Sequence, residues 1–296
     1  MRRTEAGVAL LCARLDDMDA RPLTTAQYCE LCKRANALRG TERERELAAS
    51  DLLRLGYTEH EAGRILYLLS REKRLAAYLQ EARRVGVALV TRLSAQYPAK
   101  LARAMGMRCP PVLFFRGNPS LFQSRCVSLV GSRRLAEENR KFAARVGTLA
   151  AREGYTLVSG NAAGADRTAQ EACLRAGGSV ICFVADSLQD VRHPQPGARV
   201  LLCSEACYHA EFSAARALSR NHLIHAMGEK TLVAQTDCGR GGTWAGSCDN
   251  LRCGYSPLFV FDDGSQGAAA LLARGAQPVN TLQSLAGLRP VQMSLF

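Results

Sequence analysis

From about residue 85 onward, short β-rich runs alternate with amphipathic stretches that have helical spacing. The β-rich runs are Val87–Thr91, Val112–Arg116, Val127–Val130, Thr156–Ser159, Val180–Ala185, Val200–Cys203, Thr231–Gln235 and Leu258–Phe261. The helical stretches between several of them are Glu137–Arg152, Asp166–Ala176, Ala214–Met227 and Ala268–Arg274. Strands that alternate with helices need crossover connections, which make most strands parallel and cover both faces of the sheet. The sequence therefore predicts an α/β fold with a doubly wound, mainly parallel sheet.

The first 84 residues have a different pattern, with apolar residues at helical spacing throughout. The expected helices are Gly7–Leu15, Thr25–Asn36, Glu44–Leu55, Glu59–Leu69 and Glu72–Arg84, with Thr58 as an N-cap. We therefore expect three parts. These are a small all-helical domain at residues 1–84, the sheet domain at residues 85–280, and a C-terminal tail at residues 281–296.

The positive charge is concentrated in one stretch of the chain. The protein has 39 Lys and Arg against 27 Asp and Glu, and residues 85–152 alone hold 12 basic and two acidic residues. Such a concentration is typical of a surface that binds a polyanion. A solvated basic face without a partner is the alternative. Binding to a membrane surface is less favoured, because the stretch is predicted as strands and loops rather than as a basic amphipathic helix.

The twelve cysteines do not form a metal-binding pattern. Cys29 and Cys32 make a CxxC pair without a matching second pair, and Cys203, Cys207 and His209 are too few for a zinc site. We expect no metal and no cofactor, and reduced thiols that are mostly buried. No apolar run is long enough to span a bilayer, and no signal peptide is recognisable at the N-terminus. We therefore expect a cytoplasmic protein without membrane association.

Four polar segments follow predicted strands, and in doubly wound folds ligands bind beyond the carboxyl ends of the strands. The candidate phosphate- or DNA-binding residues in these segments are Gly131, Ser132, Arg133, Ser159, Gly160, Gly164, Asp166, Arg220, Asn221, Gly241, Gly242 and Thr243. Glycines let the backbone approach a ligand, and helix N-termini present free N–H groups to an anion. Asp166 is expected either to cap a helix or to hold Arg133 or a sugar hydroxyl. Phe212 and Trp244 lie nearby in the sequence, and Trp244 is a candidate for stacking on a base.

Two common nucleotide-binding patterns are absent. The chain contains no GxxxxGK[ST] segment, and no GxGxxG fingerprint follows the first strand. An ATPase and an ordinary dehydrogenase are therefore disfavoured.

Taken in order, these segments resemble the DprA/Smf family of DNA-processing proteins. The resemblance covers residues 86–262 and includes Tyr97-Pro98, the Gly131-Ser132-Arg133 turn, the loop from Ser159 to Asp166, and Arg220-Asn221. It implies an extended Rossmann-like domain that binds single-stranded DNA without catalysis, assists a RecA-type recombinase in DNA uptake, and forms a homo-oligomer. The family's F-x-x-RN segment is stretched here, with Phe212 eight positions before Arg220. The small winged helix that many members carry after the sheet is not recognisable.

Two alternatives use the same pocket. LOG-type phosphoribohydrolases of nucleoside monophosphates share this fold and need a glutamate soon after a GGxGT segment. Here Gly241-Gly242-Thr243 is followed by no carboxylate before Asp249, and Glu205 and Asp166 are the remaining acid–base candidates. A sensor that binds a free nucleotide and signals through the helical domain is the other alternative.

The last six residues, Val291–Phe296, follow a proline and are expected to form an exposed tail. The segment resembles the peptide by which bacterial replication and repair proteins bind the sliding clamp. Gln292, Leu295 and Phe296 are its candidate contact residues. A tail that folds back on the sheet domain is the alternative.

Overall fold

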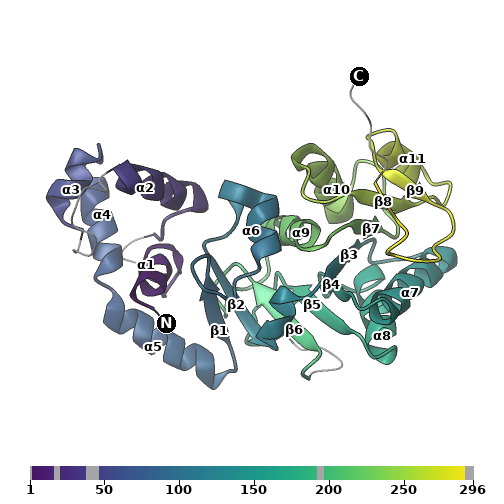
Figure 1. The fold of residues 1–296 in the computed structure, drawn as a ribbon, viewed down its shortest axis with the longest axis horizontal. Helices are drawn as coiled ribbons and strands as arrows, with labels where there is room; N and C mark the ends of the chain where they lie inside the picture. The colour runs from purple at the N-terminus through teal and green to yellow at the C-terminus, as the bar shows by residue number, and fades with distance from the viewer. Residues whose placement is uncertain (1, 17–20, 38–46, 192–196, 291–296) are drawn as a thin grey trace.

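The computed structural model describes residues 2–16, 21–37, 47–191 and 197–290. Its N-terminal part is helical, as predicted, and lies at one end of the molecule (Figure 1). The helices are α1 (Arg3–Cys12), α2 (Thr25–Ala37), α3 (Ala49–Arg54), α4 (Glu59–Leu69) and α5 (Glu72–Arg84). Thr58 caps α4, since its Oγ1 accepts a hydrogen bond from the Glu61 N–H at 3.2 Å. That residues 1–84 fold independently stays a prediction.

A nine-stranded sheet follows, in the order β1-β2-β6-β5-β4-β3-β7-β8-β9. Its strands are β1 (Ala88–Thr91), β2 (Val112–Gly117), β3 (Cys126–Val130), β4 (Thr156–Ser159), β5 (Ser179–Phe183), β6 (Val200–Ser204), β7 (Thr231–Val233), β8 (Leu258–Phe261) and β9 (Gln277–Val279). Strands β3 to β9 are parallel to one another, whereas β2 pairs antiparallel with both β1 and β6. The predicted doubly wound, mainly parallel, Rossmann-like fold is therefore confirmed.

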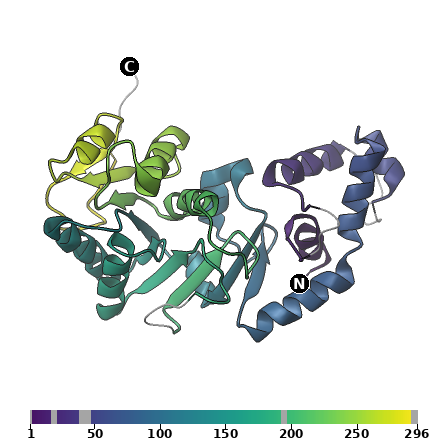
Figure 2. The ribbon, with the colours of Figure 1, turned by 180° about the vertical axis from the view of Figure 1, so that it is seen from behind.

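Helices cover both faces of the sheet, as Figures 1 and 2 show from opposite sides. One face carries α7 (Glu137–Arg152) and α8 (Ala165–Arg175). The other face carries α6 (Ala99–Met105), α9 (Ala214–Met227), α10 (Gly241–Cys253) and α11 (Gln266–Leu272). Successive residues of a strand point to opposite faces, so β3 places Val127 and Leu129 in one core and Cys126 and Val130 in the other. None of the helices in the described ranges has the length and apolar character that crossing a bilayer requires.

The chain order of the sheet reverses between β3 and β7. From β3 the chain adds β4, β5 and β6 on one side, and it then returns to place β7 on the other side of β3. Loops that leave β3 and β7 consequently diverge to opposite faces and leave a crevice between them. Any ligand site of this fold is expected at their carboxyl ends.

The chain after β9 is held against the sheet domain up to residue 288. Leu282 and Leu285 are buried in the core, although the sequence predicted a tail from residue 281. The Lys230 ammonium donates to the Leu285 and Leu288 carbonyls at 2.7 and 2.6 Å, and the Glu153 carboxylate accepts the Leu285 N–H at 2.9 Å. The predicted clamp-binding residues 291–296 lie outside the described part of the chain.

Candidate nucleic-acid interface

A cleft of about 950 Å³ opens at the carboxyl ends of β3 and β7, where the strand order reverses. Residues from all four predicted polar segments line it, together with the start of α9. Of the predicted site residues, those lining the cleft are Gly131, Ser132, Arg133, Asp166, Arg220, Asn221, Gly241, Gly242 and Thr243. The structure therefore brings most of the predicted residues together in one cleft.

The turn after β3 is bound tightly to the end of β7. Both the Ser132 N–H and the Ser132 hydroxyl donate to the Gln235 carbonyl, at 3.0 and 3.2 Å. Gly131 is required here, because a Cβ at this position would lie 2.5 Å from the Cβ of Ala165. The turn leaves the side chain of Arg133 exposed at the mouth of the cleft.

The loop after β4 shapes the cleft from behind, and Ser159, Gly160 and Gly164 do not line it. The hydroxyl of Ser159 is buried and accepts a hydrogen bond from Gln170 at 2.6 Å. Gly164 has φ +80°, and a Cβ there would lie 2.3 Å from the Arg133 carbonyl oxygen. These three residues support the site rather than face a ligand in it.

Asp166 binds the backbone of the loop after β4. Its Oδ2 accepts hydrogen bonds from the N–H groups of Gly160 and Ala162, at 3.0 and 3.1 Å. Burial raises the pKa of Asp166, while the charge of Arg220 and the two N–H groups oppose that rise. A carboxylate oxygen bound in this way holds the loop in place.

Two neighbouring residues of α9, Arg220 and Asn221, bind backbone carbonyls of different segments around the cleft. Arg220 Nη1 donates to the Phe183 carbonyl at 2.9 Å and also to the Gly160 carbonyl, so it joins the ends of β5 and β4. The Asn221 amide donates to the Gly242 carbonyl at 2.9 Å and so fixes the start of α10. Burial lowers the pKa of the Arg220 guanidinium, and its Nε has no hydrogen-bond partner among the described residues.

The N-terminus of α10 points its first residues at the cleft. Gly241 and Gly242 are exposed, and the first turn of this 13-residue helix contains no acidic residue. The first N–H groups of a helix lack partners within it and attract anions. Trp244, in the same turn, is half-buried and packs its ring under Arg274, whose Cζ lies 4.9 Å from the ring centroid. This contact takes one face of the indole that the sequence offered for base stacking.

Three exposed arginines, Arg133, Arg134 and Arg240, line the cleft. Their guanidinium groups make no hydrogen bond or ion pair with any residue in the described ranges. Of the basic residues in the predicted footprint of residues 85–152, Arg133 and Arg134 line the cleft. Others are neutralised elsewhere, as Arg125 is by Glu229 at 3.2 Å.

The exposed apolar residues that line the cleft were not among the predicted site residues. Phe212 is 52% exposed and Leu218 is 44% exposed, and both line the cleft beside Ala214 and Ala217. Ala217 occupies the position three residues before Arg220, where the family's F-x-x-RN segment has its aromatic residue. An aromatic side chain is nevertheless present in the cleft, supplied by the longer loop.

Asp166 is the one acid–base candidate that lines the cleft, whereas Glu205, the other candidate, and Asp249 do not line it. Asp249 lies within 3.1 Å of His222 Nε2 and 2.6 Å of Arg252 Nη2, and the His222 hydrogen bond lowers the pKa of Asp249 most. Glu205 is half-buried beside a cavity of only about 10 Å³ behind the cleft, and burial raises its pKa. No group of three or more metal-ligating side chains occurs within the ranges the structure describes.

Comparison with known proteins gives a consistent result. The family model for DNA recombination-mediator protein A matches residues 88–288. A Smf protein from Synechocystis is 32% identical over 90 residues, which cover 29% of this chain and 23% of that relative, or about a quarter of its length.

Solved structures resemble the fold over a longer span. DNA processing protein A (DprA) from Streptococcus pneumoniae matches with a TM-score of 0.72 and 23% identity, over 90% of this chain and 94% of its own. The Helicobacter pylori protein, described for its mode of binding single-stranded DNA, matches with a TM-score of 0.55 and 23% identity, over 67% of this chain and 92% of its own. The chain therefore belongs to the DNA recombination-mediator protein A family, the DprA/Smf family that its sequence resembles.

Proposed function

We propose that this protein binds single-stranded DNA in the cleft between β3 and β7, chiefly through the phosphates. The observation that carries the proposal is the group of three exposed arginines without acidic partners, Arg133, Arg134 and Arg240. Arginine presents a fork of donors that matches phosphate oxygens. The N-terminus of α10 adds free N–H groups to the same cleft. The Helicobacter pylori relative's described binding of single-stranded DNA supports this assignment.

The apolar residues of the cleft favour a single strand over a duplex. Phe212 and Leu218 present exposed apolar surface in the same cleft as the arginines. Unpaired bases can stack on an aromatic ring whatever their identity, whereas the bases of a duplex already stack on one another. A cleft with a cationic rim and an apolar wall suits a chain of phosphates with bases turned aside.

Binding without catalysis is the function we infer. A LOG-type hydrolase would need a glutamate soon after Gly241-Gly242-Thr243, and the first carboxylate after this segment, Asp249, is paired with His222 and Arg252. Asp166 lines the cleft, but its Oδ2 already accepts two backbone hydrogen bonds. A free nucleotide in the same cleft is the competing proposal, since a mononucleotide offers both a phosphate and a base.

Fluorescence anisotropy with three ligands tests the proposal. A labelled single-stranded oligonucleotide should bind at least tenfold more tightly than a hairpin duplex of the same length. Nucleoside monophosphates at about 10 μM should leave the complex intact. Equal affinity for the duplex would contradict the single-strand proposal, and full competition by micromolar monophosphate would favour the nucleotide sensor or the hydrolase.

The family resemblance carries three finer proposals. We propose that the protein acts in the cytoplasm, forms a homo-oligomer, and assists a RecA-type recombinase in DNA uptake and recombination. Recombinase filaments should form faster on oligonucleotides precoated with a single-strand-binding protein when this protein is present. No acceleration would contradict the recombinase proposal and leave DNA binding untouched.

The sequence of the last six residues carries a separate proposal, the sliding clamp as partner. Leu295 and Phe296 would insert into an apolar pocket of the clamp, and Gln292 would set the register by hydrogen bonds. A fluorescent peptide of residues 287–296 should bind the clamp with a Kd of about 1 μM, or about −8 kcal/mol. The Leu295→Ala, Phe296→Ala peptide should not bind, and a wild-type peptide without saturable binding would contradict the proposal.

A further inference from the structure

The connector between β6 and α9, residues 205–213, supplies the aromatic residue of the cleft. Its Phe212 is 52% exposed, although Cys207 and Tyr208 of the same connector are buried. An exposed phenyl ring gains free energy by collapsing onto nearby apolar surface. Something must therefore hold the backbone at Phe212 so that its ring remains at the cleft.

Arg216, on the first turn of α9, holds this backbone. Its Nη1 donates to the carbonyl of Ala210 at 2.6 Å and also to that of Glu211, the two residues directly before Phe212. Its Nη2 donates to the hydroxyl of Ser204 at 3.1 Å, at the end of β6. The guanidinium thus joins the start of the connector to its last turn.

The backbone of the same residue fixes the other side of Phe212. Ser213 is the N-cap of α9, and its Oγ accepts a hydrogen bond from the Arg216 N–H at 3.2 Å. Phe212 therefore lies between two residues whose positions both depend on Arg216. Arg216 itself is not among the residues that line the cleft; it borders the small cavity behind it.

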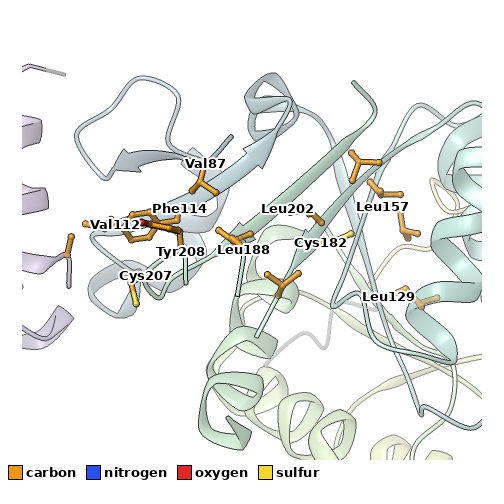
Figure 3. Packing of buried hydrophobic residues seen from close by; sticks show 14 of the residues in the cluster. Val87, Val112, Phe114, Leu129, Leu157, Cys182, Leu188, Leu202, Cys207 and Tyr208 are labelled. Carbon is orange, nitrogen blue, oxygen red and sulfur yellow. The ribbon is translucent and has the colours of Figure 1, made fainter. Parts of the chain in front are cut away.

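The early part of the connector is fixed to the rest of the molecule. Cys207 and Tyr208 are buried, and Figure 3 shows them beside Phe114 of β2. Tyr208 also packs on Tyr78 of α5, with ring centroids 5.0 Å apart. Because Cys207 and Tyr208 are anchored in the core, the position of Phe212 depends on the turn at Ala210 and Glu211, whose carbonyls Arg216 binds.

We propose that Arg216 is a positioning residue, which sets the affinity for single-stranded DNA by holding Phe212 as the stacking wall of the cleft. The inference rests on the proposed function. A lysine cannot reproduce three hydrogen bonds arranged in a planar fork. The role is therefore specific to the guanidinium and is not a matter of positive charge near the DNA.

A double-mutant cycle between Arg216 and Phe212 tests the inference. Phe212→Ala should weaken oligonucleotide binding about tenfold, the lower range for loss of one stacked base. Arg216→Gln should weaken it by a similar factor, and Arg216→Lys by less. Adding Arg216→Gln to Phe212→Ala should have no further effect, because the two residues act as one unit. Arg175→Gln, an exposed arginine in the last turn of α8, is the charge-matched control and should bind as the wild type does.

Salt dependence separates positioning from direct contact. The log–log slope of affinity against salt should be the same for Arg216→Gln as for the wild type. A slope shallower by about 0.7 would show that Arg216 contacts a phosphate and would overturn the inference. A full effect of Arg216→Gln that persists in the Phe212→Ala background would overturn it as well.

Hydrogen exchange tests the same inference without DNA. Amides of residues 206–213 should exchange at least tenfold faster in Arg216→Gln than in the wild type, while those of β3 and α10 stay unchanged. Unchanged exchange in the connector would overturn the positioning role. If the wild type bound no single-stranded DNA, the proposed function would fail, and this measurement would still decide whether Arg216 holds the connector.

Discussion

The exposed arginines of the cleft give the sharpest prediction about DNA binding. Arg133, Arg134 and Arg240 line the cleft, and their guanidinium groups have no acidic partner among the described residues. Arg133 follows the β3 turn, which Ser132 binds to the end of β7. Arg133→Ala should therefore remove one phosphate contact and leave the turn in place.

The size of the effect follows from counterion release. Each phosphate contact with a single strand contributes about 0.7 to the slope of log affinity against log salt, so three contacts give about −2. Raising the salt from about 50 to about 200 mM should weaken wild-type binding about 18-fold and Arg133→Ala binding about sevenfold. At the lower salt, the lost charge-assisted hydrogen bond should cost about 1.5 kcal/mol, or about tenfold in affinity.

The assay is a set of oligonucleotide titrations at four or more salt concentrations. Arg152→Ala is the matched control, because Arg152 is exposed in the last turn of α7, at the opposite end of the sheet from the cleft. This variant changes the net charge equally and should keep the wild-type slope. Equal slopes for Arg133→Ala and the wild type would refute a phosphate contact at Arg133. An equal change of slope in Arg133→Ala and Arg152→Ala would show that the net charge of the protein, and not a contact at Arg133, sets the salt dependence.

Three further predictions concern the framework of the site. Gly164→Ala should destabilise the fold and weaken DNA binding more than Gly154→Ala, as urea unfolding and titration will show. Both glycines have positive φ, a strain of about 1–2 kcal/mol for alanine, but only the Gly164 Cβ would meet backbone, the Arg133 carbonyl oxygen. Lys230→Met removes two charge-assisted hydrogen bonds and should lower the free energy of unfolding by about 3 kcal/mol, with DNA affinity unchanged. Elemental analysis should find no stoichiometric zinc; one equivalent would contradict this.

The fold was predictable where local pattern and burial agree. The strands Thr156–Ser159 and Leu258–Phe261 begin and end as predicted, because each is a short β-rich run between turns. β9 was not predicted, since Gln277–Val279 is short and contains a proline, and its pairing with β8 forms it. The antiparallel pairing of β2 with β1 and β6 was not predicted either, because the direction of a strand depends on contacts with residues distant in sequence.

The sequence predicted where the candidate site lies better than it predicted what each of its residues does. Strand ends and glycines located the cleft, since the topology of a doubly wound sheet brings those ends together. Charge counting along the chain was a weaker guide, because it could not show that Arg125 pairs with Glu229 at 3.2 Å. It also missed Arg240, which reaches the cleft from a part of the chain with no excess of positive charge. Net charge of a segment does not distinguish neutralised arginines from free ones.

The stretched spacing between Phe212 and Arg220 has a structural explanation that sequence comparison alone obscures. The number of residues between two positions does not fix their distance in space. A longer connector can therefore place its aromatic residue where a shorter segment would place it. Here Ser213 starts α9, and Arg216 binds the carbonyls before Phe212, so the ring lines the same cleft as Arg220. In the sequence, Arg216 looks like one more basic residue on a helix surface. Its three acceptors come from both ends of the connector, and only the folded chain brings them within reach of one guanidinium.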